Sequence, residues 1–231
     1  MSHRLTIGAF LLLAACSKTP SKEQSEAGRA AAPAAIVPVA TEAPAGTYRL
    51  DKAHASLVFT VDHVGFSNYT GEFKRFDATL EFDPKNAEAM SVTATIDPSS
   101  LDVPSPPEGF VAELLGQGWL DASQFPEMTF KSTAVELTGP QTAKIAGDFA
   151  LHGVTLPVDI EARYNGGYKG FPPYDPNARI GFSASGSLSR SAFGLVAGLP
   201  PEGSTMGVGD TVSFAIEAEF NGPAVEGAVS E

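Results

Sequence analysis

Residues 76–98 read FDATLEFDPKNAEAMSVTATIDP, and this stretch decides the fold. Apolar residues occupy alternate positions of 76–82 and again of 90–96, and Asp83-Pro84 stands between the two runs. Side chains of successive residues point to opposite faces of a β-strand, so such alternation predicts two strands with one buried face each. Asp-Pro favours a turn. The stretch therefore predicts a pair of antiparallel strands.

The same period of two recurs along the chain. It is found in residues 57–61, 128–130, 145–149, 156–160, 180–184 and 212–218. Turn signals separate the runs, among them Gly139-Pro140, Asn165-Gly166 and Asn221-Gly222. Many short strands at regular spacing indicate an all-β sandwich or barrel.

One segment departs from this pattern. Residues 107–120, PEGFVAELLGQGWL, place Phe110, Val111, Leu114 and Leu115 at helical spacing before two glycines. We expect one short helix inserted between strands, either laid over a mouth of a barrel or plugging its core. Trp119 and Phe125 flank the following loop and are expected to anchor the helix.

The N-terminus carries an export signal. A basic start, an apolar run from Ile7 to Ala15 and small residues before Cys16 form the pattern of a secretory signal peptide. The run is shorter than the roughly 20 residues that a membrane-spanning helix needs. Leu13-Ala14-Ala15-Cys16 resembles the lipobox of bacterial lipoproteins, which implies lipidation of Cys16. An unmodified thiol beside an ordinary signal peptide is the alternative.

Composition divides the chain into parts. We expect a signal peptide at 1–15, a lipidated cysteine and disordered Ala/Pro-rich tether at 16–46, a folded domain at 47–222 and a flexible tail at 223–231. A chain beginning at Ala45 is then expected to unfold at the same temperature as the mature form. The residue after the cysteine is Ser17 and not the Asp that in many enteric bacteria signals retention at the inner membrane, which weakly favours the outer membrane.

Charge and residue content exclude several function classes. The net charge of −12 disfavours nucleic-acid partners. His54, His63 and His152 form no close pair of metal ligands, so no metal is expected. There is no Gly-x-Ser-x-Gly motif, and the single cysteine is assigned to the anchor. We expect no catalytic residues and no cofactor other than a bound lipid.

Ordered motifs along residues 47–222 carry a family resemblance. They are YRLDKAHAS from Tyr48, VDHVGFSNYTGEF from Val61, FPEMTFKST from Phe125, GDFALHGVTLPV from Gly147, LSRSAFGL from Leu188 and VGDTVSFAIEAEF from Val208. Together they resemble the YceI-like family of bacterial lipocalin-like, polyisoprenoid-binding periplasmic proteins. The chain departs from the family pattern at the entry to the helix and in a longer loop, residues 166–179.

The resemblance implies an extended antiparallel barrel of eight strands around a long apolar tunnel. Such a tunnel would hold an isoprenoid, a quinone tail or a fatty-acid derivative. The alternation selects the inward side chains Phe59, Val61, His63, Phe76, Leu80, Phe82, Val92, Ile96 and Phe130 as ligand contacts. Leu114 and Leu115 from the helix, Phe66 and Arg190 are expected to join them.

The sequence leaves two possible roles open for each of two polar residues, His63 and Arg190. His63 continues the inward series of its strand and would meet a polar head, or it is satisfied by a turn carbonyl. Arg190 pairs with an acid at the rim, Asp148 being the candidate, or it binds a phosphate. The acidic chain slightly favours a neutral head, such as a quinone or amide, over a pyrophosphate.

The predicted function is that of a periplasmic, membrane-tethered carrier of an apolar lipid. A solid-barrelled envelope or stress protein and a lipid-modifying enzyme with His63 as base are the alternatives. A homodimer is left open.

Overall fold

The computed structural model describes residues 36–224. The predicted signal peptide, Cys16, most of the tether and residues 225–231 lie outside the described residues. Among residues 36–224, no helix has the length and hydropathy to cross a membrane.

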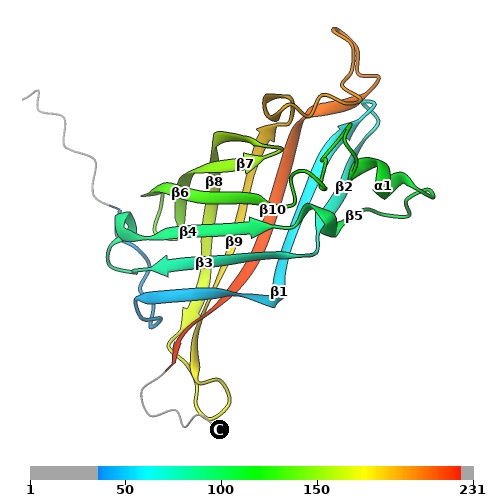
Figure 1. Ribbon diagram of the computed structural model, residues 1–231. Helices are drawn as coiled ribbons and strands as arrows, with labels where there is room; N and C mark the ends of the chain where they lie inside the picture. The colour runs from blue at the N-terminus through cyan, green and yellow to red at the C-terminus, as the bar shows by residue number, and fades with distance from the viewer. Residues whose placement is uncertain (1–35, 225–231) are drawn as a thin grey trace, which may run out of the picture. The chain divides into compact units, whose positions relative to one another are not determined.

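The described chain is an all-β fold built from long strands (Figure 1). The strands are β1 (Gly46–His63), β2 (Ser67–Phe73), β3 (Phe76–Phe82), β4 (Ser91–Ile96), β5 (Leu101–Asp102), β6 (Met128–Leu137), β7 (Thr142–Leu151), β8 (Val154–Tyr168), β9 (Asn177–Ser189) and β10 (Val208–Ala224). Short 3₁₀ turns lie at Ala87–Ala89, Pro98–Ser100 and Ser191–Phe193. Every run of alternating residues identified in the sequence coincides with one of these strands, although Met90, the first residue of the run 90–96, lies just before β4.

Eight of the strands close into an antiparallel barrel. The order is β10-β9-β8-β7-β6-β4-β3-β1, and β1 pairs back onto β10 along most of its length. β1 pairs with β3 near its start and with β2 near its end, and β2 then pairs with the two-residue strand β5. The predicted eight-stranded antiparallel barrel is confirmed.

The only α-helix of the described residues is α1 (Phe110–Leu114). It lies in the connection between β5 and β6, within the stretch 107–120 where the sequence predicted one short helix, and it is five residues long. Gly116 stops it, and the amides of Trp119 and Asp121 bond back to the Gly116 carbonyl in successive turns. Figure 1 shows α1 beside β2 and β5 at one end of the barrel.

Two packed clusters lie toward opposite ends of β8. One surrounds Tyr48, Ile180 and Phe220, and the other surrounds Met128, Leu151 and Phe193. Between them many inward side chains stay only half-buried, for example Val92, Ala162 and Ile216. In a filled barrel these inward positions would be fully buried. Their partial exposure indicates a hollow interior.

Candidate functional site

The candidate site is a cavity inside the barrel. Its volume is about 520 Å³, within the range of roughly 300–1,000 Å³ that is usual for small-molecule sites. Every strand that closes the barrel contributes inward side chains. On β10 alone the lining runs from Val208 to Phe220. These thirteen residues of strand span roughly 40 Å, so the cavity is long as well as apolar.

Polar side chains gather at the two ends of the cavity. At the end covered by α1 the polar lining residues are His63, Tyr69 and Arg190, and at the opposite end they are Thr41, Ser91, Gln141, Thr142 and Tyr164. The wall between them is aliphatic and aromatic. We call these the α1 end and the Thr41 end. A ligand that fits must therefore be apolar over most of its length.

Glycines on neighbouring strands keep the aromatic side chains flat against the wall. Phe59 on β1 lies opposite Gly71 on β2, and Phe214 on β10 lies opposite Gly186 on β9. A Cβ at either glycine would overlap the facing ring. Because the glycines leave that space free, the rings cover the wall instead of filling the centre. The alternating pattern identifies the phenylalanines but gives no sign of these glycines.

The α1 end has an open mouth at His63. Leu57, Phe59, Val61 and His63 all line the cavity, as their alternation predicted. His63 is also exposed to solvent, so the cavity reaches the surface there. Its ring lies 6.1 Å from that of Tyr69, which in turn lies 6.5 Å from the ring of Phe110 on α1. Leu114 lines the same end. Of the two roles considered for α1, the helix takes the one over a mouth.

Most of the predicted contact residues lie on the cavity wall. These are Phe59, Val61, His63, Phe76, Leu80, Phe82, Val92, Ile96, Leu114, Phe130 and Arg190. Two lie off the wall and are corrected here. Phe66 is 83 % exposed, because the tight turn after His63 carries its side chain outward. Leu115 follows the last residue of α1 and does not share the inward face of Leu114.

Arg190 has neither of the two roles considered for it. Its guanidinium donates to four backbone carbonyls, those of Leu195, Ala197, Val208 and Gly209, at 2.7–2.8 Å. Only 5 % of the residue is exposed, and the guanidinium carbon lies 5.6 Å from the ring centre of Trp119. Burial lowers the pKa of Arg190, and the nearby Asp210 opposes that shift. Arg190 therefore fixes the loop after β9, and Asp148 is not its partner.

The two aromatic residues that follow α1 in the chain make different contacts. Trp119 lines the cavity beneath Arg190. Phe125 packs on His152, with 4.7 Å between the ring centres.

At the Thr41 end, residues assigned to the tether line the cavity. Pro38, Val39 and Thr41 belong to the wall. The Val39 amide donates to the Pro140 carbonyl at 2.8 Å, and the Thr41 and Tyr164 hydroxyls lie 2.6 Å apart. Ala43 is 2 % exposed. The predicted start of the folded domain at Thr47 is thus corrected. Small Ala and Pro residues gave no strand signal, yet they pack well against a wall.

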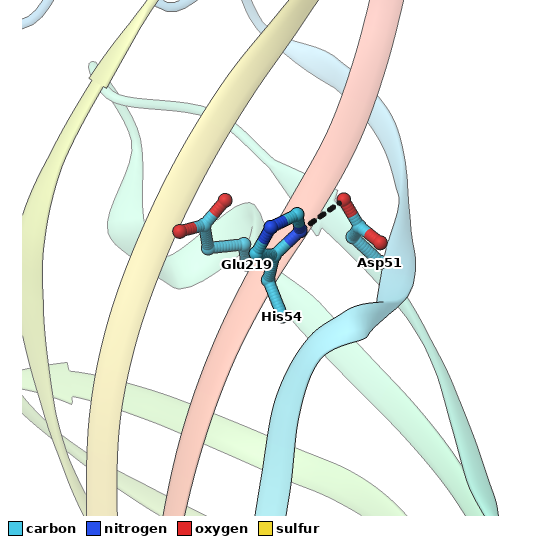
Figure 2. A group of neighbouring side chains, drawn as sticks. All are labelled: Asp51, His54 and Glu219. Atoms are coloured by element: carbon cyan, nitrogen blue, oxygen red, sulfur yellow. Dashed lines mark hydrogen bonds and ion pairs between the residues drawn. The ribbon is translucent and has the colours of Figure 1, made fainter.

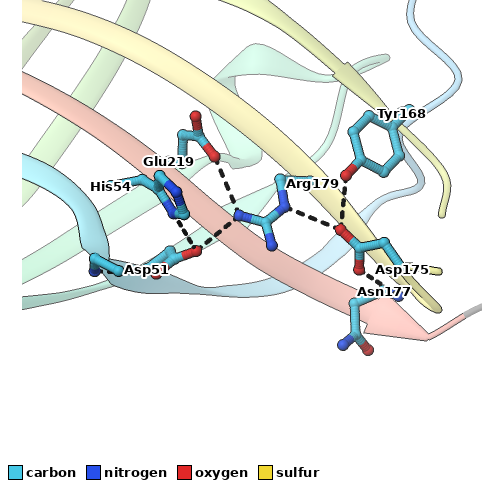
Figure 3. A network of polar contacts seen from close by, with 8 residues as sticks. Asp51, His54, Tyr168, Asp175, Asn177, Arg179 and Glu219 are labelled. Atoms are coloured by element: carbon cyan, nitrogen blue, oxygen red, sulfur yellow. Dashed lines mark hydrogen bonds and ion pairs between the residues drawn. The ribbon is translucent and has the colours of Figure 1, made fainter. Parts of the chain in front are cut away.

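A network of charged groups lies on the outer face of the barrel. Arg179 on β9 bonds to Asp51 on β1 at 2.7 Å, to Glu219 on β10 at 3.1 Å and to Asp175 at 3.1 Å (Figure 3). Tyr168 donates to Asp175 at 2.7 Å. The network fastens the longer loop of residues 166–179 to the barrel.

Part of this network has the donor types of a metal site. Asp51, His54 and Glu219 offer ligand atoms within 4.8 Å of one another, and Figure 2 shows the bond from His54 to Asp51. The Arg179 guanidinium, however, already bonds to both carboxylates. Hydrogen bonds from His54 and then Arg179 lower the pKa of Asp51 to about 2. The group is an ion-pair network whose positive charge is supplied by arginine.

The chain is similar in sequence to a known family and to proteins of other bacteria. A family model described as YceI-like domain matches residues 48–220. A UPF0312 protein of Pseudomonas syringae pv. syringae is 35 % identical over 158 residues, which cover 68 % of this chain and 80 % of the relative. Protein YceI of Salmonella arizonae is 36 % identical over 161 residues, which cover 69 % and 81 %.

Solved structures share the fold. BcnA of Burkholderia cenocepacia superposes with a TM-score of 0.63 at 24 % identity, over 74 % of this chain and 98 % of that one. A domain of Saccharophagus degradans described as polyisoprenoid binding gives a TM-score of 0.55 at 14 % identity, over 76 % and 98 %. At these identities the likeness is one of fold.

Proposed function

This chain belongs to the YceI-like family, and we propose that it is a binding protein that holds one long apolar lipid inside its barrel. The single observation that carries the proposal is the cavity, which is aliphatic and aromatic along its length and polar only at its ends. An isoprenoid, a quinone tail or a fatty-acid derivative has this distribution of polarity. The Saccharophagus domain of the same fold is described as polyisoprenoid binding.

The polar head of the lipid would lie at the α1 end, beside His63 and Tyr69. Both side chains can donate or accept a hydrogen bond. Arg190 is engaged by backbone carbonyls. A second arginine, Arg75, precedes β3 and pairs with Asp97 at 2.8 Å, so it is engaged as well. A neutral head, such as a quinone or an amide, therefore suits this mouth better than a pyrophosphate does.

The two other functions fit the cavity less well. A solid structural barrel would leave no space of about 520 Å³. An enzyme with His63 as base needs a nucleophile beside it. Among the described lining residues, the aliphatic hydroxyls of Thr41, Ser91 and Thr142 belong to the Thr41 end. We therefore propose binding rather than catalysis.

Extraction of the purified protein followed by mass spectrometry tests the proposal. We expect a copurified prenyl or quinone-like lipid. The absence of any copurified lipid, together with no binding of prenyl or quinone probes, would overturn it. Recovery of a prenyl pyrophosphate would contradict only the preference for a neutral head group and would leave the proposed binding function intact.

A matched pair of variants links binding to the cavity. Phe130→Asp puts a charge on the wall, which costs several kcal/mol unless the group is neutralised. Lys131→Asp changes the exposed neighbour. Ala162→Phe fills the cavity without adding a charge, in case Phe130→Asp does not fold. We expect Phe130→Asp and Ala162→Phe to lose the lipid and Lys131→Asp to keep it.

We further propose that the protein works in the periplasm, held by lipid on Cys16 and, by a slight preference, at the outer membrane. The support is Leu13-Ala14-Ala15-Cys16 and the apolar run before it. Intact-mass measurement should find a chain that begins at an acylated Cys16, and Cys16→Ser should abolish both cleavage and acylation. A membrane-bound Cys16→Ser protein of unchanged mass would refute the anchor.

A further inference from the structure

Three exposed apolar side chains surround the mouth at the α1 end. Phe66 is 83 % exposed, Val196 60 % and Met206 64 %. We call these three residues the apolar rim. Single exposed apolar residues are common on protein surfaces, whereas a group of them at one place marks an interaction site.

Backbone contacts bring the loops of the apolar rim together. The Val64 amide donates to the Gly207 carbonyl at 2.8 Å, which joins the turn of Phe66 to the loop of Met206. The Val208 amide donates to the Gly198 carbonyl at 2.7 Å, which joins that loop to the segment after Val196. Figure 1 shows the two loops at the same end of the barrel as α1. The turn begins at His63, which lines the cavity.

The apolar rim is held rigidly rather than left loose. Arg190 bonds to the carbonyls of Leu195, Ala197 and Val208, on both sides of the loop that carries Val196 and Met206. Val64, in the turn that carries Phe66, has a φ of +53°. That conformation is uncommon for a β-branched residue and costs of the order of 1–3 kcal/mol, and such strain persists only where surrounding structure enforces it.

The charge of the two loops selects the kind of surface that could cover the rim. Residues 62–66 and 196–207 contain two carboxylates, Asp62 and Glu202, and no lysine or arginine. Anionic membranes attract clusters of lysine and arginine, so these loops would be repelled by one. A zwitterionic bilayer has an apolar interior but no net surface charge, so it does not repel these loops. Its interface accommodates aromatic side chains.

We propose that the apolar rim docks onto a zwitterionic lipid bilayer, so that a lipid passes between the bilayer and the cavity through the mouth at His63. This inference rests on the proposed function. A long apolar ligand would otherwise have to cross water between membrane and barrel, which is unfavourable in proportion to its exposed area. Phe66, Val196 and Met206 enter the bilayer interface and bring the mouth against it.

A fluorescent label tests docking directly. A chain that begins at Ser17 lacks both the apolar signal segment and the single native cysteine, so Met206→Cys takes one environment-sensitive label. Tyr174→Cys, at a side chain 83 % exposed on the loop of residues 166–179, is the matched control. Phosphatidylcholine vesicles should shift the emission of the label at 206 to the blue and leave the label at 174 unchanged.

Equal responses at the two positions, or none at 206, would overturn docking. A shift at 206 that needs no vesicles and grows with protein concentration would also overturn it, since a second copy of the chain would then cover the rim. Vesicles rich in phosphatidylglycerol should give a smaller shift than phosphatidylcholine, and a larger one would contradict the charge argument.

Transfer kinetics distinguish this inference from the proposed function. A dansyl-labelled prenyl alcohol is loaded into the chain that begins at Ser17, and its release into phosphatidylcholine vesicles is followed. Phe66→Ser with Met206→Ser should slow release at least 10-fold while its equilibrium affinity stays within 2-fold. Phe171→Ser with Tyr174→Ser, an exposed aromatic pair elsewhere, should release at the wild-type rate.

Unchanged release by the rim variant would overturn the inference and leave the binding function intact. Failure of the wild-type protein to bind the probe would overturn the proposed function and, with it, passage of lipid through the mouth.

Discussion

The hydroxyl oxygens of Thr41 and Tyr164 lie 2.6 Å apart, although 123 residues separate them in the chain. Tyr164 lies on β8 inside the barrel, and Thr41 precedes the first strand. The bond fixes the segment before β1 across the Thr41 end of the cavity. The fold therefore extends beyond the region of alternating residues.

A chain beginning at Ala45 should unfold at a lower temperature than one beginning at Ile36. It lacks the Thr41 bond, the buried Ala43 and the Pro44 carbonyl that accepts from Tyr48 at 2.8 Å. One lost hydrogen bond costs about 1 kcal/mol, which shifts the melting temperature of a domain this size by about 2–4 °C. Circular dichroism during heating measures the difference. Identical melting temperatures would show that residues 36–44 do not stabilise the fold and belong to the tether.

Gly186→Ala should narrow the cavity and weaken ligand binding. The added methyl group would lie 2.4 Å from the ring of Phe214, which it would push inward, and 2.8 Å from the backbone carbonyl oxygen of Asp159. Overpacking of this kind typically costs about 1–3 kcal/mol of stability. Gly181→Ala on the same strand meets only Glu219, at 4.0 Å, and serves as the control. Titration of a prenyl probe should show a weaker affinity for Gly186→Ala alone, and adding Phe214→Leu should restore part of it, because only the contact with the Asp159 carbonyl then remains.

Arg190→Lys should destabilise the protein although the charge is kept. A lysine ammonium cannot reproduce the planar set of donors that reaches four carbonyls at once. With hydrogen bonds to a charged group contributing about 1.5–3 kcal/mol each, we expect a loss of about 3 kcal/mol. Urea unfolding measures it, and Arg49→Lys at an exposed position is the control. Equal midpoints for Arg190→Lys and wild type would refute this role.

Stability should fall in acid in part because of Asp51. Bonds from His54 and Arg179 lower its pKa to about 2 in the folded protein, against about 3.9 in an unfolded chain. A group whose pKa is lower in the folded state stabilises that state above the unfolded pKa. The contribution is lost as pH falls through the interval from about 4 to 2.

Asp51→Asn should therefore be less stable than wild type at pH 7, and the difference should shrink as the pH approaches 2. Asp148→Asn, at an exposed position on β7, controls for the loss of a carboxylate. Denaturant unfolding at a series of pH values measures both variants. A difference between Asp51→Asn and wild type that is constant from pH 7 to pH 2 would contradict the linkage.

The sequence by itself determined the strands and most of the side chains that face inward, whereas the eight-stranded barrel was implied by the family resemblance. Period-two runs such as Leu57-Phe59-Val61 fix which side chains face inward, because a strand alternates its faces without reference to the rest of the chain. The inward positions of His63 and Phe130 follow from that local rule. The short helix before β6 was also found from the spacing of its apolar residues, and it ends before Gly116 as the sequence predicts.

Only the tertiary structure decided what depends on contacts between distant segments. Closure of β1 onto β10, the space left for Phe214 by Gly186 and the bond from Thr41 to Tyr164 each need two parts of the chain that no local pattern relates. The role of Arg190 was missed for the same reason, since its acceptors are backbone carbonyls, which every residue carries. Alternation fixes the direction of a side chain, but whether the space it faces is filled depends on what the opposite wall contributes.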